Sequence, residues 1–106
     1  MREYKNDIAG SLTEVEEDVI TRSQCRDLAA FEQLVRKYQP YAYSLAMKFL
    51  CDEAEASDVV QDSFLRVWKN IDRYDPKQKF TTWLYKIVIN LCVDRFRALK
   101  RSRSVF

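Results

Sequence analysis

Residues 58–68 read Asp-Val-Val-Gln-Asp-Ser-Phe-Leu-Arg-Val-Trp, and this stretch decides the fold. On a helical wheel of about 100° per residue, its apolar side chains gather on one side, as in a helix that covers a core. This core face consists of Val60, Phe64 and Val67 within the stretch, together with Ala56 before it and Ile71 after it. The pattern predicts an amphipathic α-helix over about residues 53–71, with Glu53 and Glu55 in a first turn whose dipole favours acidic groups.

The opposite side of this predicted helix forms what we call the acidic face. Its residues are Asp58, Gln61, Asp62 and Leu65, with Trp68 at the border. Acidic groups around an apolar contact point suit docking onto a basic partner helix. An ordinary solvated face with one exposed leucine is also common, so the wheel alone leaves both interpretations open.

Apolar periodicity and capping residues predict further helices on both sides of this one. The four predicted helices cover about residues 14–24, 28–50, 53–71 and 82–99. The expected N-terminal capping residues are Thr13 with Glu16 for the first helix, Asp27 for the second and Thr81 or Thr82 for the fourth. The second helix keeps one apolar phase across Pro40, which favours a single kinked helix. The predicted fold is all-α: a compact bundle of about four helices, with a short N-terminal helix, a long kinked helix and two further helices.

The composition of the 106 residues agrees with helices and argues against several functions. One glycine and two prolines are too few for the turns of a β-sandwich or barrel. No apolar run approaches the roughly 18 residues of a membrane span, and no apolar segment follows Met1 as in a signal peptide. The absence of histidine removes the commonest general base and metal ligand. Catalysis, a metal site and a cofactor are therefore not expected.

Cysteine usage points to a reducing compartment. The three cysteines, Cys25, Cys51 and Cys92, are odd in number, widely spaced and without a Cys-x-x-Cys motif. A disulfide framework or zinc site is therefore not expected. The simplest interpretation is that these small apolar side chains fill the core.

Charge is distributed unevenly along the chain. Residues 1–62 contain seven Lys/Arg and thirteen Asp/Glu, whereas residues 63–106 contain eleven Lys/Arg and three Asp/Glu. On the fourth predicted helix one face, the basic stripe, consists of Trp83, Lys86, Asn90, Asp94, Arg97 and Arg101. Tryptophan can stack on an unpaired base, asparagine can read a base edge, and cations can meet phosphates. The alternative is that Trp83 and Phe80 belong to the core and that the cations are simply solvated.

Three ordered blocks of sequence resemble a known family. They are residues 58–68 quoted above, Ile-Asp-Arg-Tyr-Asp at 71–75, and Phe-Thr-Thr-Trp-Leu-Tyr-Lys-Ile-Val-Ile-Asn at 80–90. Upstream, residues 29–38 (Ala-Ala-Phe-Glu-Gln-Leu-Val-Arg-Lys-Tyr) look like the opening of the same region. Together they closely resemble region 2 of bacterial sigma factors, and in particular the extracytoplasmic-function (ECF) group, over about residues 16–101.

This resemblance implies two binding surfaces. In the family, the helix matching the acidic face docks on the clamp helices of the largest subunit of core RNA polymerase. The matching residues here are Asp58, Gln61, Asp62, Leu65 and Trp68. The following loop and last helix capture the non-template strand of the promoter's minus-ten element, with one base flipped into a pocket. The expected DNA-binding residues are Tyr74, Lys79, Phe80, Trp83, Lys86, Asn90, Arg97 and Arg101.

The resemblance also implies a cytoplasmic factor that starts transcription, that has no catalytic activity, and that an anti-sigma factor holds inactive. The expected organisation is an N-terminal tail at residues 1–12, the region 2 helical domain at 13–101 and the start of a linker at 102–106, with the second sigma domain absent. A helical protein–protein interaction module without DNA binding is the alternative. The basic stripe distinguishes the two, because a pure adaptor has no need of it.

Overall fold

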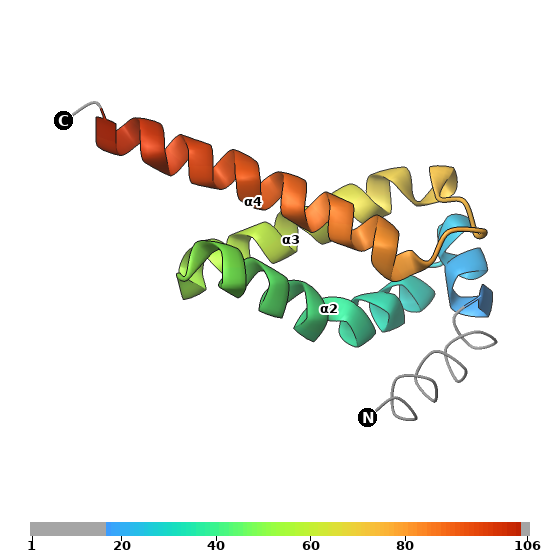
Figure 1. Cartoon of the computed structure of the whole chain (residues 1–106). Helices are drawn as coiled ribbons and strands as arrows, with labels where there is room; N and C mark the ends of the chain where they lie inside the picture. The colour runs from blue at the N-terminus through green and yellow to red at the C-terminus, as the bar shows by residue number, and fades with distance from the viewer. Residues whose placement is uncertain (1–16, 105–106) are drawn as a thin grey trace, which may run out of the picture. The chain divides into compact units, whose positions relative to one another are not determined.

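Helices account for most of residues 17–104, which the computed structural model describes (Figure 1). Their order is a helix at residues 17–24, α2 (Leu28–Leu50), α3 (Glu53–Asn70), the short 3-10 helix η1 (Ile71–Arg73) and α4 (Phe80–Ser104). No strand occurs in this part of the chain. The predicted all-α fold of about four helices is therefore confirmed. The predicted tail at residues 1–12 and the predicted capping pair Thr13 and Glu16 lie outside the described residues.

The chain divides into two compact units, residues 1–37 and residues 38–106. In the first unit Asp27 caps α2 as predicted, because its Oδ1 accepts a hydrogen bond of 3.2 Å from the backbone N–H of Ala30. Arg22 pairs with Asp18 at 3.2 Å and with Asp27 at 3.6 Å. The second of these pairs ties the start of α2 to the helix that precedes it.

In the second unit, α2 presents a narrow buried stripe to the core. The helix continues without a break through Pro40, as the apolar phase predicts. Its buried residues beyond Lys37 are Tyr38, Ala42 and Ala46. The spacing of four places all three on one side of the helix. Two of the three side chains are single methyl groups, which leave room for close approach by a neighbouring element.

Aromatic contacts set the direction of α4 along α2. The ring centroids of Tyr38 and Phe80 lie 4.8 Å apart, and those of Phe49 and Phe96 lie 6.4 Å apart. Both contacts advance along the chain in the same sense, so α2 and α4 run in the same direction. α3 runs the opposite way and packs against α4 (Figure 1).

α3 supplies the largest group of buried side chains. Its N-cap is Asp52, whose Oδ1 accepts a hydrogen bond of 2.9 Å from the backbone N–H of Glu55. The predicted core residues Ala56, Val60, Phe64, Val67 and Ile71 are all buried. Val59 and Ser63 are buried as well, and the Ser63 hydroxyl donates to the Val59 carbonyl at 2.7 Å. The core face is therefore wider than predicted, and its one hydroxyl is satisfied within the helix.

α4 differs from the sequence prediction at both ends. It begins at Phe80, so Thr81 and Thr82 lie inside the first turn and the prediction that one of them caps the helix is wrong. The helix continues to Ser104, well beyond the predicted end at residue 99. The continuation has a simple cause: alanine, leucine, lysine and arginine at residues 98–101 favour a helix, and residues 102–104 include no glycine or proline. The buried side of α4 repeats every four residues, at Phe80, Leu84, Val88 and Cys92.

The three cysteines do not share one role. Cys92 is fully buried, as expected for a core filler, but Cys25 and Cys51 are exposed. Cys51 directly follows α2 and has a positive φ of 54°. A residue in this left-handed conformation commonly ends a helix. Cys51 therefore ends α2 and is not part of the core.

Candidate functional site

The acidic face of α3 is open to solvent. Asp58, Gln61, Asp62 and Leu65 are all exposed, and Leu65 exposes 58% of its surface. Trp68 is half-buried at the border. The exposure follows from helix geometry, because these positions lie opposite the buried side of α3. An apolar side chain of this size surrounded by carboxylates offers a partner both apolar contact area and negative charge.

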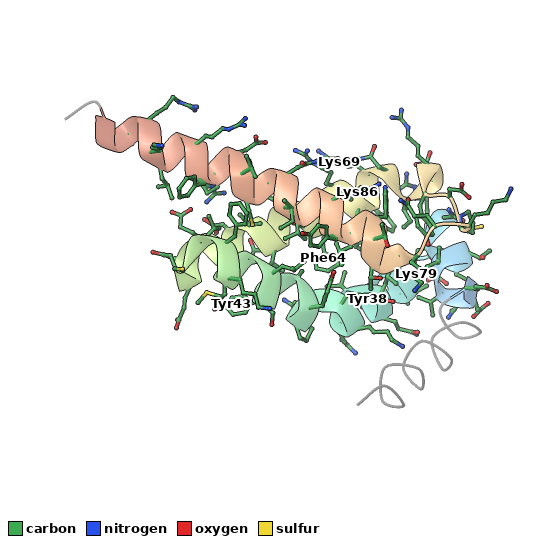
Figure 2. The ribbon with its side chains drawn as sticks, in the orientation of Figure 1. Tyr38, Tyr43, Phe64, Lys69, Lys79 and Lys86 are labelled. Carbon is green, nitrogen blue, oxygen red and sulfur yellow. The ribbon has the colours of Figure 1, made fainter. Side chains whose placement is uncertain are left out.

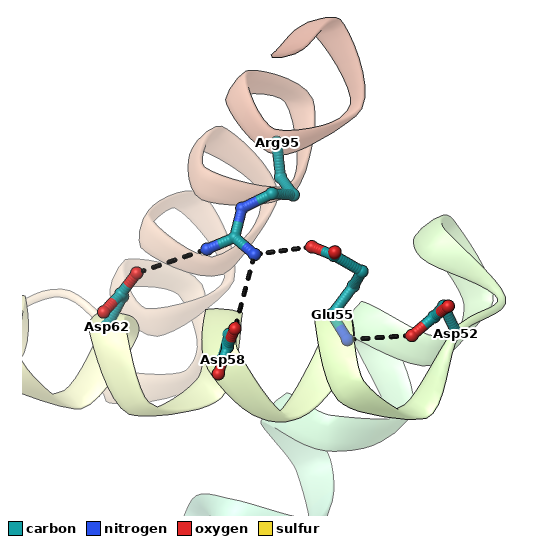
Figure 3. A network of polar contacts seen from close by, with 5 residues as sticks. All are labelled: Asp52, Glu55, Asp58, Asp62 and Arg95. Carbon is teal, nitrogen blue, oxygen red and sulfur yellow. Dashed lines mark hydrogen bonds and ion pairs between the residues drawn. The ribbon is translucent and has the colours of Figure 1, made fainter. Parts of the chain in front are cut away.

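A residue that the sequence analysis missed, Arg95 of α4, reaches this acidic face. Its guanidinium lies 2.5 Å from a Glu55 carboxylate oxygen, 3.7 Å from Asp58 and 3.6 Å from Asp62 (Figure 3). A signal for this contact was present, since on a helical wheel Arg95 falls between Leu84 and Val88 on the core-facing side of α4. A cation at such a position needs an anion from a neighbouring element.

The electrostatics of this cluster favour the charged guanidinium. The hydrogen bond to Glu55 raises the pKa of Arg95, partial burial acts in the opposite direction, and the charges of Glu55, Asp58 and Asp62 raise it further. The exposed fractions differ sharply, at 27% for Arg95 and 28% for Glu55 against 65% for Asp58 and 52% for Asp62. The Glu55–Arg95 pair is therefore partly shielded from water, whereas the two aspartates remain accessible from outside.

The basic stripe of α4 lies on the exposed side of that helix. Lys86, Asn90, Asp94, Arg97 and Arg101 are exposed, and Trp83 is half-buried at the N-terminal end. The stripe carries three cations against the single carboxylate of Asp94, so its net charge is positive. Such a surface can follow a phosphate backbone, and its amide can contact a base edge.

The loop before α4 is held by an aromatic cluster. The ring centroid of Tyr74 lies 5.7 Å from that of Phe80 and 5.1 Å from that of Trp83, and the rings of Phe80 and Trp83 are 5.9 Å apart. Tyr74 and Phe80 are buried, with 5% and 4% exposed. Their ring faces are therefore committed to the fold, and of the three rings Trp83 is the most accessible.

Local hydrogen bonds shape the same loop. The Tyr74 hydroxyl donates to the carbonyl oxygen of Gln78. Asp75 accepts twice, with its side chain from the Lys77 N–H at 3.0 Å and with its carbonyl from the Gln78 N–H at 2.9 Å. Lys79 is exposed next to this turn; Lys79 and Lys86, the two lysines predicted to bind DNA, are labelled in Figure 2. The loop thus has a defined shape with a cation at its exit into α4.

The predicted DNA-binding residues form two groups in the structure. Tyr74, Phe80 and Trp83 come together in the aromatic cluster, and Lys79 lies beside them in the chain. Lys86, Asn90, Arg97 and Arg101 continue along the exposed side of α4. The assignment of all these residues to DNA, and of the acidic face to polymerase, remains a prediction.

Neither a metal centre nor a membrane span occurs in the part of the chain that the structure describes. Within residues 17–104, no group of cysteine, aspartate and glutamate side chains is placed so that it would hold a metal ion. Nor is any helix in this range both long and apolar enough to cross a membrane.

The fold and its exposed surfaces define a class of protein: a helical domain with an acidic surface and a basic surface on adjacent helices. The sequence matches the profile of the family described as Sigma-70 region 2 over residues 34–102, and the chain belongs to this family.

The chain is 42% identical over 74 residues to the ECF RNA polymerase sigma factor SigW of Bacillus subtilis, covering 70% of this chain and 40% of that protein. It is 36% identical over 88 residues to the RNA polymerase sigma-H factor of Pseudomonas aeruginosa, covering 83% and 46%. The chain thus spans less than half the length of these relatives.

Solved structures agree with this membership. An engineered region 2 of sigmaE, determined in complex with GTAAAA, is similar with a TM-score of 0.74 and 33% identity, over 79% of this chain and 87% of that one. CnrH, determined in complex with the cytosolic domain of CnrY, is similar with a TM-score of 0.72 and 29% identity, over 85% of this chain and 62% of that one. The predicted resemblance to region 2 of ECF sigma factors is confirmed.

Proposed function

We propose that this domain binds core RNA polymerase and the single-stranded minus-ten element of promoter DNA, and so takes part in starting transcription. The observation that carries the proposal is the similarity to region 2 of sigmaE in its complex with GTAAAA, which extends over most of both chains. The exposed acidic face and the exposed basic stripe supply one surface for each partner. The function is binding without catalysis, and its place is the cytoplasm, where core polymerase acts.

The polymerase contact is assigned to Asp58, Gln61, Asp62, Leu65 and Trp68. All but the half-buried Trp68 are exposed on α3. A basic helix pair such as the polymerase clamp would find carboxylates for its cations and Leu65 for its apolar side chains. Complementary charge at such an interface gives orientation and a fast encounter, and desolvated charge pairs add affinity.

The DNA contact is assigned to the loop before α4 and to the basic stripe. Trp83 is the ring best placed to stack on an unpaired base, because Tyr74 and Phe80 are buried. The rings of Tyr74 and Phe80 contact Trp83 and would shape the loop that receives the flipped base. Asn90 would read one base, while Lys79, Lys86, Arg97 and Arg101 would contact phosphates.

A regulatory protein is a further proposed partner. CnrH, which is similar over 85% of this chain, was determined in complex with the cytosolic domain of CnrY. We infer that an anti-sigma factor of comparable function covers surfaces of this domain and competes with polymerase. Such competition would keep the domain inactive until the regulator is removed.

The decisive experiment reverses the charge of Asp62 and measures binding to purified core polymerase. Asp62→Lys places a cation on the acidic face and near Arg95, while the buried side of α3 is unchanged. We expect a loss of about 2–4 kcal/mol in binding free energy, in the range for truncating one partner of an interfacial charge pair. Asp62→Asn, which only removes the charge, should lose less.

The matched control is Glu32→Lys, the same reversal of charge at an exposed position of α2, outside the acidic face. It should bind polymerase within about twofold of the unaltered chain, as expected for an exposed charge outside the contact. Circular dichroism confirms that each variant is folded. An Asp62→Lys variant that is folded and binds with unchanged affinity contradicts the polymerase assignment.

A further inference from the structure

Glu55 and Arg95 form a pair that adjoins the acidic face but belongs to neither predicted surface. The guanidinium lies 2.5 Å from Glu55 and more than 1 Å farther from Asp58 and Asp62, at 3.7 Å and 3.6 Å (Figure 3). Only the first distance is that of a strong charge-assisted hydrogen bond. Arg95 is therefore held by Glu55, and it engages the two aspartates only loosely.

The alternative arrangement, with Arg95 bound closely to the aspartates, would reduce the negative charge of the acidic face. A guanidinium has five N–H donors in a planar fork and can bind a carboxylate through two of them. If Glu55 did not hold Arg95, the carboxylates next in reach would be Asp58 and Asp62. Arg95 would then occupy the oxygen atoms that a basic partner needs.

We propose that Glu55 is a positioning residue that takes the closest contact of Arg95, limits the pairing of Arg95 with Asp58 and Asp62, and thereby preserves part of the negative charge of the acidic face for a basic partner. This inference rests on the proposed docking to polymerase. The two members of one ion pair then have opposite effects on docking. Removing Glu55 releases Arg95 onto the aspartates and weakens binding, whereas removing Arg95 uncovers the aspartates and strengthens it.

A merely structural ion pair predicts a different result. Both members would then support the packing of α4 on α3, and loss of either one would lower stability and docking together. The opposite signs expected here concern affinity only. Thermal unfolding is expected to show that both Glu55→Gln and Arg95→Gln lower stability, because each breaks the same contact between α3 and α4.

The experiment measures the affinity of the 106-residue chain and its variants for core RNA polymerase at low and at moderate salt. For Glu55→Gln we expect an affinity about two- to fivefold lower than that of the unaltered chain at low salt. For Arg95→Gln we expect an affinity about two- to fivefold higher, in line with the strength of partly exposed ion pairs. Both differences should shrink as salt is added, since the interacting charges are accessible to screening.

Two matched controls separate position from total charge. Glu53→Gln makes the same charge change as Glu55→Gln, in the same first turn of α3. Lys48→Gln removes one positive charge, as Arg95→Gln does, from the last turn of α2. Both residues are exposed and lie outside the four-residue cluster, so we expect affinities within about twofold of the unaltered chain.

The outcomes are distinct for the inference and for the proposed function. Opposite shifts for Glu55→Gln and Arg95→Gln, with both controls near the unaltered chain, support the inference. Weaker binding by both variants, or equal effects of Glu53→Gln and Glu55→Gln, overturns the inference and leaves the proposed function standing. An unaltered chain that does not bind core polymerase overturns the proposed function, and the inference with it.

Discussion

The acidic face of α3 and the basic stripe of α4 are exposed surfaces on neighbouring helices, and they differ in how their charged side chains are paired. On α3, both carboxylates of the acidic face lie within ion-pair distance of Arg95, which crosses from α4 and makes its closest contact with Glu55. On α4, the cations Lys86, Arg97 and Arg101 are exposed along the helix, with Asp94 as the one carboxylate among the residues of the stripe. The negative charge of the acidic face is therefore partly offset by a cation of the same fold, whereas the cations of the basic stripe are spread along one exposed side of α4.

The largest expected effect comes from a change that removes the common support of both surfaces. Phe64 is buried on the side of α3 opposite the acidic face (Figure 2). We expect Phe64→Ala to lower the free energy of unfolding by about 3–5 kcal/mol, as for other buried phenylalanines. Chemical denaturation monitored by circular dichroism measures this, and binding at both surfaces should fall together. A loss at only one surface would mean that the two do not share a core.

The next effect should separate the two surfaces. Trp83→Ala removes the most accessible ring of the aromatic cluster, so we expect the complex with core polymerase to lose about 1–3 kcal/mol in binding single-stranded GTAAAA DNA. Affinity for polymerase itself should be unchanged. Because Trp83 contacts Tyr74 and Phe80, Trp83→Phe serves as the control that keeps a ring in the cluster. If Trp83→Ala binds single strand and duplex as the unaltered chain does, the stacking role is wrong.

A third comparison lies within the basic stripe and separates backbone contact from base reading. Asn90→Ala should relax discrimination at one base by about 1–3 kcal/mol and leave the salt dependence nearly unchanged. Arg101→Ala should weaken binding to all sequences alike and reduce the salt slope by about 0.7 for each phosphate that is no longer neutralised. Titrations of the polymerase complex with variant oligonucleotides at several salt concentrations measure both. A changed salt slope for Asn90→Ala with intact base preference would reassign Asn90 to the backbone.

A smaller effect is expected at the cap of α3. Asp52→Ala removes the acceptor for the Glu55 N–H and should cost about 1 kcal/mol of stability. The same change loosens the backbone of Glu55, so docking to polymerase should weaken slightly while DNA binding is preserved. Asp52→Asn, which retains a side-chain oxygen acceptor, is the control and should recover most of the stability in a denaturant titration. Equal losses for both variants would show that the cap contributes by charge and not by its hydrogen bond.

The smallest effect concerns the pH dependence of the buried side of α4. Burial raises the pKa of the Cys92 thiol, and the positive charge of Arg95 acts against this increase. The folded state therefore favours the neutral thiol. Its contribution to stability is fully present below the ordinary thiol pKa of about 8.5 and is lost as the pH rises above it.

Denaturation at about pH 7 and about pH 9.5, on either side of that thiol pKa, should show a smaller loss of stability for Cys92→Ala than for the unaltered chain. Arg95→Gln should enlarge the loss, because the charge that lowers the thiol pKa is gone. Cys51→Ala, at an exposed cysteine, provides the comparison for a thiol outside the core. An identical pH dependence in all of these chains would contradict the assignment to Cys92.

Much of the fold was predictable because local sequence patterns indicate helices. The apolar spacing around Phe64 and Val67 fixed the buried side of α3, and Asp27 was recognisable as a cap from its place before an apolar run. The end of α4 was predicted too early: residues 100–104 include no glycine or proline that would stop the helix. The first residue of a helix depends on which backbone hydrogen bonds form at its start, and the sequence pattern does not specify these bonds. The start of α4 at Phe80 therefore lies one or two residues before the predicted caps Thr81 and Thr82.

The candidate site was less predictable where it depends on contacts between helices. The exposure of the acidic face and of the basic stripe follows from the wheels. The link from Arg95 to Glu55 does not, because it joins positions 40 residues apart in the chain, which no periodicity connects. The burial of Tyr74 was also hidden, since it depends on how the loop folds back against Phe80 and Trp83.

The positions of the two tryptophans have an optical consequence. Trp68 is half-buried at the border of the acidic face, and Trp83 is half-buried at the start of the basic stripe. Indole fluorescence responds to solvent exposure and to stacking, so each surface has its own intrinsic reporter. In a Trp68→Phe chain the remaining emission would follow the capture of an unpaired base by Trp83. Single-stranded DNA contains no indole, so this binding event can be timed by stopped-flow fluorescence without attaching a dye.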